Sequence, residues 1–228
     1  MLFNDRKQAG ALLVEKLSSF RGSSVVVIGL ARGGVVVASR IASDLPALLD
    51  VLVVKKIPSP LDSELAIGAL TEEGVFYINW KLAHRLSADE DYVNRQIRTL
   101  ADQIKQKTIL YKKGRKPIDV RGKTVILVDD GVATGATMIA AKRWCKKKHA
   151  KKIIVALPVL SYDRIGIIRR EVDELIYLDA PNDFSSVGQW YKQFDQVEDR
   201  EVIKLLRRDA NQRMHANATN KKRVYSYH

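Results

Sequence analysis

Apolar residues along the chain fall into short unbroken runs that alternate with stretches of helical spacing. The runs are rich in β-branched residues and predict strands at Val25–Leu30, Asp50–Lys55, Val125–Val128, Lys152–Leu157 and Leu175–Leu178. Apolar residues three or four positions apart predict helices at Asp5–Leu17, from after Gly34 to about Asp44, Val93–Lys112, from Thr137 to about Lys146, Ser161–Glu171 and Val197–Leu206. This alternation indicates an α/β fold with a doubly wound, mostly parallel sheet.

Residues 55–64 interrupt the alternation. Pro58 and Pro60, together with mixed charges, predict an irregular loop there. Ala66–Leu70 and Val75–Ile78 then flank a short polar turn and predict a β-hairpin. We expect loop and hairpin, residues 55–78, to form one flexible flap.

One helix has a clear start signal, because Ser87 followed three residues later by Glu90 matches a capping box. Another ends in the cluster Lys146–His149, where cations complement the helix dipole. The lysines of residues 142–152 could also contact the phosphates of a nucleic acid.

The C-terminal part of the chain changes character twice. Residues 179–197 are dense in aromatic side chains, which either stack on a flat ligand or anchor a loop to the core. From Arg207 onward, six basic residues against one acidic residue leave five positive charges and few apolar positions. Residues 207–228 are therefore predicted to be a disordered basic tail, and residues 1–206 the folded domain.

The stretch Val125–Thr137 carries the clearest chemistry. A buried strand leads into Asp129 and Asp130, then into a loop containing Thr134 and Thr137 that opens a helix. The free amides and the positive dipole end of a helix N-terminus favour an anion, and the threonine hydroxyls can add donors. The two carboxylates would repel a phosphate but suit hydroxyl groups or a metal beside it, so the pattern predicts a ribose phosphate.

A second loop of this kind follows the first strand at Ala31–Gly34. Gly33 and Gly34 let backbone amides approach an anion, and Arg32 adds a donor. The spacing is not that of a dinucleotide fingerprint. From the residues alone, an anion site and a plain tight turn between strand and helix both remain open.

Composition adds a few bounds. The 228 residues, of which 46% are hydrophobic, fit one domain with appendages, and a net charge of +13 makes polyanionic ligands plausible. The single Cys145 excludes an internal disulfide framework, and the four histidines show no metal-ligand spacing. With no signal peptide and no long apolar run, we expect a soluble cytoplasmic protein without a membrane partner.

The stretch Val125–Thr137 resembles the PRPP-binding signature of type I phosphoribosyltransferases. Ala31–Gly34 stands where that family has its pyrophosphate loop, Lys55–Leu70 where it has its flexible loop, and Asp179–Tyr191 where many members carry a hood over the base. Further segments resemble a bacterial group of predicted phosphoribosyltransferases whose acceptor is not established; they are Asp5-Arg6, Glu64–Ala69 and Val187–Tyr191. The similarity covers most of residues 1–206.

The resemblance implies a role for each matching position. Asp129 and Asp130 would accept hydrogen bonds from the ribose hydroxyls of PRPP. The 5′-phosphate would lie against Ala133, Thr134, Gly135, Ala136 and Thr137, and the pyrophosphate against Ala31, Arg32, Gly33 and Gly34. Lys55 or Lys56 would meet the departing charge, while Phe184, Val187 and Trp190 would line the base site. Mg²⁺ would be held by PRPP oxygens, with Asp129 or Asp130 adding at most a water-mediated contact.

The implied activity is Mg²⁺-dependent transfer of phosphoribosyl from PRPP to a nitrogenous acceptor, with a purine-like base as one candidate. Ala133 replaces the aspartate that some purine-using relatives use as acid or base, so that function would fall to the substrate, a hood residue or Glu64. Ala31 stands where the narrower group often has proline. The alternative is a non-catalytic regulator that senses PRPP or a nucleotide and binds nucleic acid through basic surfaces. A homo-oligomer is compatible with either function.

Overall fold

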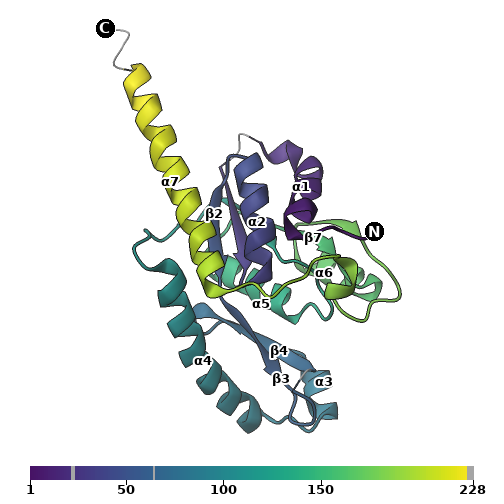
Figure 1. Ribbon diagram of the computed structural model, residues 1–228. Helices are drawn as coiled ribbons and strands as arrows, with labels where there is room; N and C mark the ends of the chain where they lie inside the picture. Colours follow the sequence, from purple (N-terminus) through teal and green to yellow (C-terminus); the bar gives the residue numbers. More distant parts are fainter. Residues whose placement is uncertain (22–23, 64, 225–228) are drawn as a thin grey trace.

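The central layer is a parallel sheet of five strands in the order β2-β1-β6-β7-β8 (Figure 1). The computed structural model describes residues 1–21, 24–63 and 65–224. The strands of this sheet are β1 Val25–Leu30, β2 Leu48–Leu52, β6 Thr124–Val128, β7 Lys152–Val159 and β8 Glu174–Asp179. All four strand pairs are parallel, which confirms the fold class expected from the sequence.

Helices cover both faces of this sheet. Side chains of β1 alternate between two cores: Val25 and Val27 enter one, Val26 and Ile28 the other. The first core is covered by α1 Arg6–Lys16, α2 Gly33–Asp44 and α7 Asp199–Val224, and the second by α5 Ala136–Lys147 and α6 Ile165–Glu171. Strands that are buried on both faces need unbroken apolar runs. Such runs are the signal that indicated strands in the sequence.

The chain order creates a switch point between β1 and β6. From β1 the chain passes through α2 to β2 on one side, and from β6 through α5 to β7 on the other side. The carboxyl ends of β1 and β6 lie next to each other, since Gly29 pairs with Val128. In open α/β sheets, ligands bind in the crevice at such a point.

A second, antiparallel sheet has the order β3-β4-β5, with β3 Val54–Pro58, β4 Ala66–Thr71 and β5 Phe76–Ile78. The hairpin is therefore confirmed. Two other expectations were wrong: the apolar run at Asp50–Lys55 is divided at Val53 between two sheets, and residues 55–58 are a strand. The run looked continuous because both strands bury apolar residues, including Leu52 and Val54.

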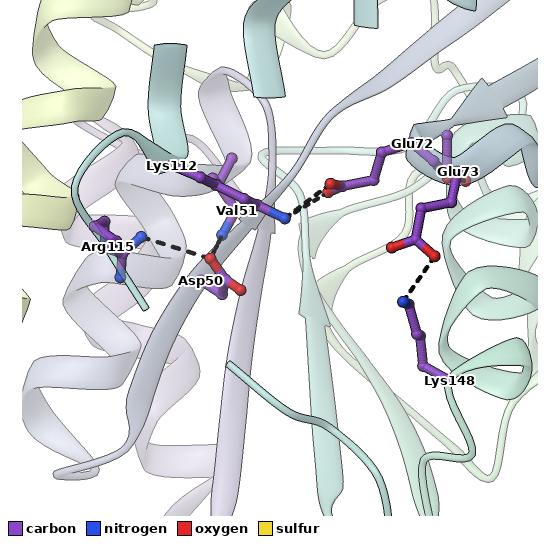
Figure 2. Close-up of polar contacts among 8 residues, drawn as sticks. Asp50, Val51, Glu72, Glu73, Lys112, Arg115 and Lys148 are labelled. Atoms are coloured by element: carbon purple, nitrogen blue, oxygen red, sulfur yellow. Dashed lines mark hydrogen bonds and ion pairs between the residues drawn. The ribbon is translucent and has the colours of Figure 1, made fainter. Parts of the chain in front are cut away.

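Charged side chains, some of them buried, contact one another around this small sheet (Figure 2). Lys112, at the end of α4 Glu90–Lys112, donates to both carboxylate oxygens of Glu72 at 2.8 and 2.9 Å. Beside it, Arg115 lies 3.5 Å from the carboxylate of Asp50 on β2, and on the other side Lys148 pairs with Glu73 at 2.7 Å. The turn between β4 and β5 is thus linked to the end of α4 through Lys112 and to the end of α5 through Lys148.

The helix starts and ends differ from expectation at two places. Ser87 has a positive φ of 57°, and the cap of α4 is Asp89, whose side chain accepts from the amide of Tyr92 at 2.7 Å. The proposed capping box was wrong, because an N-cap needs extended backbone. At the other end of the chain, α7 continues to Val224 and projects beyond the other helices (Figure 1), where the sequence predicted disorder. Residues 207–224 contain no Gly or Pro and several helix formers, so the helix meets no stop signal.

The remaining helical segments are short, namely α3 Trp80–Arg85 and the 3₁₀ turns η1 Ser18–Phe20, η2 Glu72–Gly74, η3 Tyr162–Arg164 and η4 Gly188–Trp190. Within the described ranges 1–21, 24–63 and 65–224, none of the helices combines the length and apolar character needed to cross a membrane.

Candidate functional site

Two adjacent carboxylates end β6 at the switch point. Asp129 accepts a hydrogen bond from the amide of Asp130 at 2.9 Å through its own Oδ1. Burial raises the pKa of Asp129 well above its usual value, and the charge of Asp130 adds to this effect. Burial also raises the pKa of Asp130, although Arg6 opposes the shift. Such paired, desolvated carboxylates are typical of functional sites.

The loop after the carboxylates leads directly into α5. Its backbone extends the sheet, since the amide of Val132 donates to Val159 at 3.0 Å and the amide of Ser161 donates to Val132 at 3.0 Å. Gly135 has a φ of +84° and serves as the N-cap. No described side chain caps the first turn, so the amides that open α5 are available to an anion. Thr134 is exposed and Thr137 half-buried at this end.

The glycine pair that opens α2 packs against the same carboxylates. A Cβ on Gly33 would overlap Oδ2 of Asp130 and lie 2.7 Å from its Cγ. A Cβ on Gly34 would lie 2.6 Å from the carbonyl oxygen of Val128 and 2.8 Å from Cα of Asp129. Only glycine fits either position, so the loop before α2 and the carboxylates at the end of β6 are in direct contact. The sequence alone could not show this contact.

Two features of the loop before α2 complete its description. The peptide bond between Ala31 and Arg32 is cis. The Arg32 guanidinium lies 3.9 Å from a carboxylate oxygen of Asp199, at the start of α7. Asp199 also accepts from Tyr111 at 2.6 Å and from Lys107, and these contacts lower its pKa. Arg32 is therefore shared between this loop and α7.

Arg6 is the residue that sequence reasoning missed. As the first residue of α1, it donates from Nε to Oδ2 of Asp130 at 2.7 Å and from Nη1 to the carbonyl of Asp195 at 2.9 Å. Its guanidinium also lies over the ring of Phe194, 3.8 Å from the centroid. Asp5-Arg6 had entered only as part of a resemblance, because nothing local in the sequence assigns the side chain a partner.

The segment Val187–Tyr191 holds the predicted hood in place. Gln189 accepts from the amides of Ser185 and Ser186 at 3.1 and 3.0 Å and donates to the carbonyl of Asp183 at 2.9 Å, which closes the loop on itself. Tyr191 donates its hydroxyl to the carbonyl of Asp130 at 2.6 Å. Burial raises the pKa of Tyr191, so the hydroxyl stays protonated and keeps this contact.

The three predicted hood residues differ in position. Val187 touches the loop after β6, because its Cγ1 would lie 2.5 Å from a Cβ on Gly131. Phe184 and Trp190 stack on each other with centroids 6.2 Å apart. All three pack against a small core around Phe3 and Tyr191. Only Val187 is thus placed against the loop that follows the carboxylates.

The two flap lysines also differ in position. Lys55 and Lys56 are neighbours on β3 and so point to opposite faces of the strand. Lys56 is exposed, and its charge is near enough to lower the pKa of Asp129, opposing the larger effects there. Lys55 is half-buried. Glu64 lies outside the described residues.

The chemistry of the donors bears on Mg²⁺. In the part of the chain that the structure describes, no three His, Cys, Asp or Glu side chains gather as a metal cage. The carboxylate pair nonetheless fits a magnesium ion held largely by substrate oxygens, because Mg²⁺ commonly uses one or two carboxylates and retains waters. Cys145 is buried and its pKa is raised to about 12, so a thiolate is not available near pH 7.

Comparison with known proteins agrees with this geometry. The family described as "Phosphoribosyl transferase domain" matches residues 4–183. This chain belongs to the phosphoribosyltransferase family. A crystal structure of TT1426 from Thermus thermophilus is 38% identical, with a TM-score of 0.76, and the alignment covers 90% of this chain and 98% of that one.

Curated relatives extend the comparison of this phosphoribosyltransferase-family chain. "Putative phosphoribosyl transferase Rv0571c" of Mycobacterium tuberculosis (strain H37Rv) is 38% identical over 207 residues, which are 91% of this chain and 47% of that protein. The chain therefore spans about half the length of this relative. A ribose-phosphate pyrophosphokinase of Thermococcus kodakarensis is 43% identical over 60 residues, 25% of this chain and 21% of that protein.

Proposed function

We propose that this protein transfers the 5-phosphoribosyl group of PRPP to a nitrogen atom of a small acceptor. The observation that carries the proposal is the packing of Gly33 and Gly34 against Asp130 and Asp129. Two helix N-termini, those of α2 and α5, thereby flank one carboxylate pair. This arrangement suits a ligand with phosphates at both ends and hydroxyls between them, and PRPP has that order of groups.

Each loop takes one part of the ligand in this proposal. Asp129 and Asp130 accept hydrogen bonds from the two ribose hydroxyls. Backbone amides of residues 133–137 and the hydroxyls of Thr134 and Thr137 hold the 5′-phosphate. Backbone amides of residues 32–34 face the pyrophosphate, since the amide of Ala31 donates to Leu52, and the Arg32 guanidinium adds charge from the side of α7. Arg6 is a positioning residue, because it fixes the carboxylate of Asp130 beside Gly33.

The reaction exchanges one bond at C1 of the ribose for another. The bond from C1 to the pyrophosphate oxygen breaks, pyrophosphate leaves with the electron pair, and the acceptor nitrogen forms a bond to C1 and gives up its proton. The carboxylate pair stabilises positive charge that develops on the sugar. Lys56 is the flap lysine that we assign to the departing charge, because it is exposed whereas Lys55 is half-buried. When bound, Mg²⁺ would neutralise part of the charge on the leaving group.

The acceptor class rests on the hood. Val187 lies against the loop after β6, and Phe184, which is half-buried and stacks on Trp190, would add an aromatic surface for a flat nitrogenous base. A purine-like base is the candidate we favour for testing. A general base within the phosphate loop is missing at Ala133, which favours a second candidate: a PRPP-binding regulator without turnover. A cytoplasmic location remains a prediction from the sequence.

Calorimetry with PRPP and Mg²⁺ tests the site. Wild-type protein should bind, and Asp129→Asn/Asp130→Asn should bind about a hundredfold more weakly, since two charged hydrogen-bond acceptors are lost. The matched control is Asp91→Asn/Asp102→Asn, which neutralises two exposed carboxylates of α4 and should leave affinity unchanged. Equal binding by the double site variant and wild type would contradict the assignment.

Turnover is tested separately. A panel of nitrogenous bases is incubated with PRPP, Mg²⁺ and enzyme, and release of pyrophosphate is measured alongside the phosphoribosylated product. Base-dependent release that disappears in Asp129→Asn/Asp130→Asn supports the transferase. PRPP binding without release for any base, together with competition by nucleic acid, would support the regulator instead.

A further inference from the structure

On one face of the parallel sheet, α2 lies between α1 and α7 (Figure 1). Residues of these three helices line a groove. Three adjoining cavities form it, and all three share Lys7 as a lining residue. The largest of the three measures about 450 Å³, which is within the range of small-molecule sites. Asp129 and Asp130 line none of these cavities, whereas Arg6, which contacts Asp130, lines one of them.

Cations from all three helices meet in this groove. They are Lys7 from α1, Arg40 from α2, and Arg200, Lys204 and Arg208 from α7, and together they define what we term the basic groove. Ser39 and Ser43 of α2 add two hydroxyl donors to its wall. Guanidinium, ammonium and hydroxyl groups that converge in one concavity are donors for phosphate oxygens.

The spacing of the α7 cations is unfavourable for the free helix. Arg200, Lys204 and Arg208 follow one another every four residues, so their side chains lie above each other on one face of α7. Like charges at this spacing destabilise a helix. A bound anion would remove that repulsion. A helix face with mixed charges would have no such repulsion to offset.

Most of these cations lack a carboxylate partner. Arg40 donates to Asp44 at 2.8 Å. Among the described residues, Lys7, Lys204 and Arg208 form no ion pair within 4.0 Å, and all three side chains are exposed. The charges are therefore available to a ligand rather than used to hold the helices together.

Acidic residues limit what can occupy the groove. Asp44 and Asp209 line one of the cavities, and Glu201 lines the two others, one of which is also lined by Asp5 and Asp195. These carboxylates interrupt the positive surface, so a long phosphate backbone would meet repulsion, whereas a compact ligand can stay between the cations. We propose that the basic groove is a second anion site, separate from the PRPP site, for a small metabolite that carries at least two linked phosphate groups.

Inorganic tripolyphosphate is the probe for this site. Calorimetric titration of the full chain compares wild type with Lys7→Ala/Arg208→Ala, which removes one groove cation from each of two helices. The control Lys16→Ala/Arg207→Ala removes the same two charges from the same helices at exposed positions that do not line the groove. All four side chains are exposed, and unfolding temperatures confirm that each variant folds.

The groove variant should bind tripolyphosphate at least about tenfold more weakly at one set of sites, while the control keeps wild-type affinity. Tripolyphosphate that binds at the PRPP site does so equally in wild type, groove variant and control. That binding therefore cancels in the comparison, whether or not PRPP itself binds. Equal affinity of groove variant and control would overturn the proposal. So would a duplex DNA oligonucleotide that binds wild type more tightly than tripolyphosphate and loses that binding in the groove variant.

Discussion

Arg6 donates from Nε to Oδ2 of Asp130 at 2.7 Å, although 124 positions separate the two residues in the chain. The side chains are about nine-tenths buried, with 11% and 13% of their surface exposed. An acidic residue expected to hold a sugar hydroxyl is thus already oriented by a cation on one of its oxygens.

Replacing Arg6 by Gln should weaken both folding and PRPP binding. Removing one partner of a largely buried pair leaves the carboxylate without its compensating charge, and the free energy of unfolding should fall by about 3 kcal/mol. The pKa of Asp130 should rise further because Arg6 opposes the effect of burial, so PRPP binding should improve with pH over a wider range than in wild type. Thermal unfolding and calorimetry at several pH values measure these effects.

A double variant separates position from charge. Arg6→Gln/Asp130→Asn removes the uncompensated carboxylate and should recover most of the lost stability but not PRPP affinity. If Arg6→Gln alone keeps wild-type affinity and pH dependence, Arg6 has no part in positioning Asp130.

Gly33→Ala should disturb the site from the opposite side. The new methyl group would overlap Oδ2 of Asp130, so the loop that opens α2 must move away from the carboxylates. Overpacking of this kind costs about 1 to 3 kcal/mol, and PRPP affinity should fall at least tenfold. Calorimetry and thermal unfolding report the two effects separately.

Gly166→Ala is the matched control for that change. Gly166 lies in α6, and a Cβ there meets nothing within 4 Å. Alanine is the better helix former, so stability should stay equal or rise by up to about 1 kcal/mol. A Gly33→Ala protein that behaves like Gly166→Ala would show that the close approach of the two loops is not needed.

The site divides into a part that the sequence could predict and a part that it could not. β6, Asp129, Asp130 and the start of α5 are consecutive, so one pattern contains the strand, the charges and the helix N-terminus. The contact of Gly33 with Asp130 and that of Arg6 with Asp130 depend on how separate strands and helices pack. No periodicity in the sequence reports such distances.

The fold shows the same division. Apolar runs indicated β1, β6 and β7 of the parallel sheet, because these strands are buried on both faces and such burial demands apolar runs. The same signal hid the boundary at Val53, where β2 ends in one sheet and β3 begins in the other. At the start of α4, Ser87 matches the capping-box pattern in the sequence. Its backbone is left-handed, however, and Asp89 is the N-cap.

Asp129→Asn should make the ligand-free protein more stable near neutral pH. The folded pKa of Asp129 is raised above the unfolded value, so its favourable contribution exists below the unfolded pKa and is lost as pH rises through the folded pKa. Asparagine carries no charge and can still accept the amide hydrogen of Asp130. The variant's advantage in unfolding temperature should therefore be small near about pH 4 and grow towards about pH 8. An advantage that is absent, or constant with pH, would contradict a desolvated carboxylate at this position.

Lys112→Met should destabilise the protein more than loss of an exposed lysine. Glu72 is 7% exposed, and burial already raises its pKa against the opposing effect of Lys112. Without the ammonium group the carboxylate stays buried and unpaired, at a cost of about 3 kcal/mol, whereas Lys152→Met breaks the exposed pair with Glu174 at a cost below about 1 kcal/mol.

A change at Glu72, the partner of Lys112, tests which part of the fold this ion pair stabilises. Glu72→Gln in the Lys112→Met background removes the buried charge and should restore most of the stability. Because Glu72 lies in the turn between β4 and β5, amide hydrogen exchange in β4 and β5 should accelerate in Lys112→Met and slow again in the double variant. Unchanged exchange in the single variant would mean that the turn is held by Lys148 and Glu73 instead, which Lys148→Met would then reveal by the same measurement.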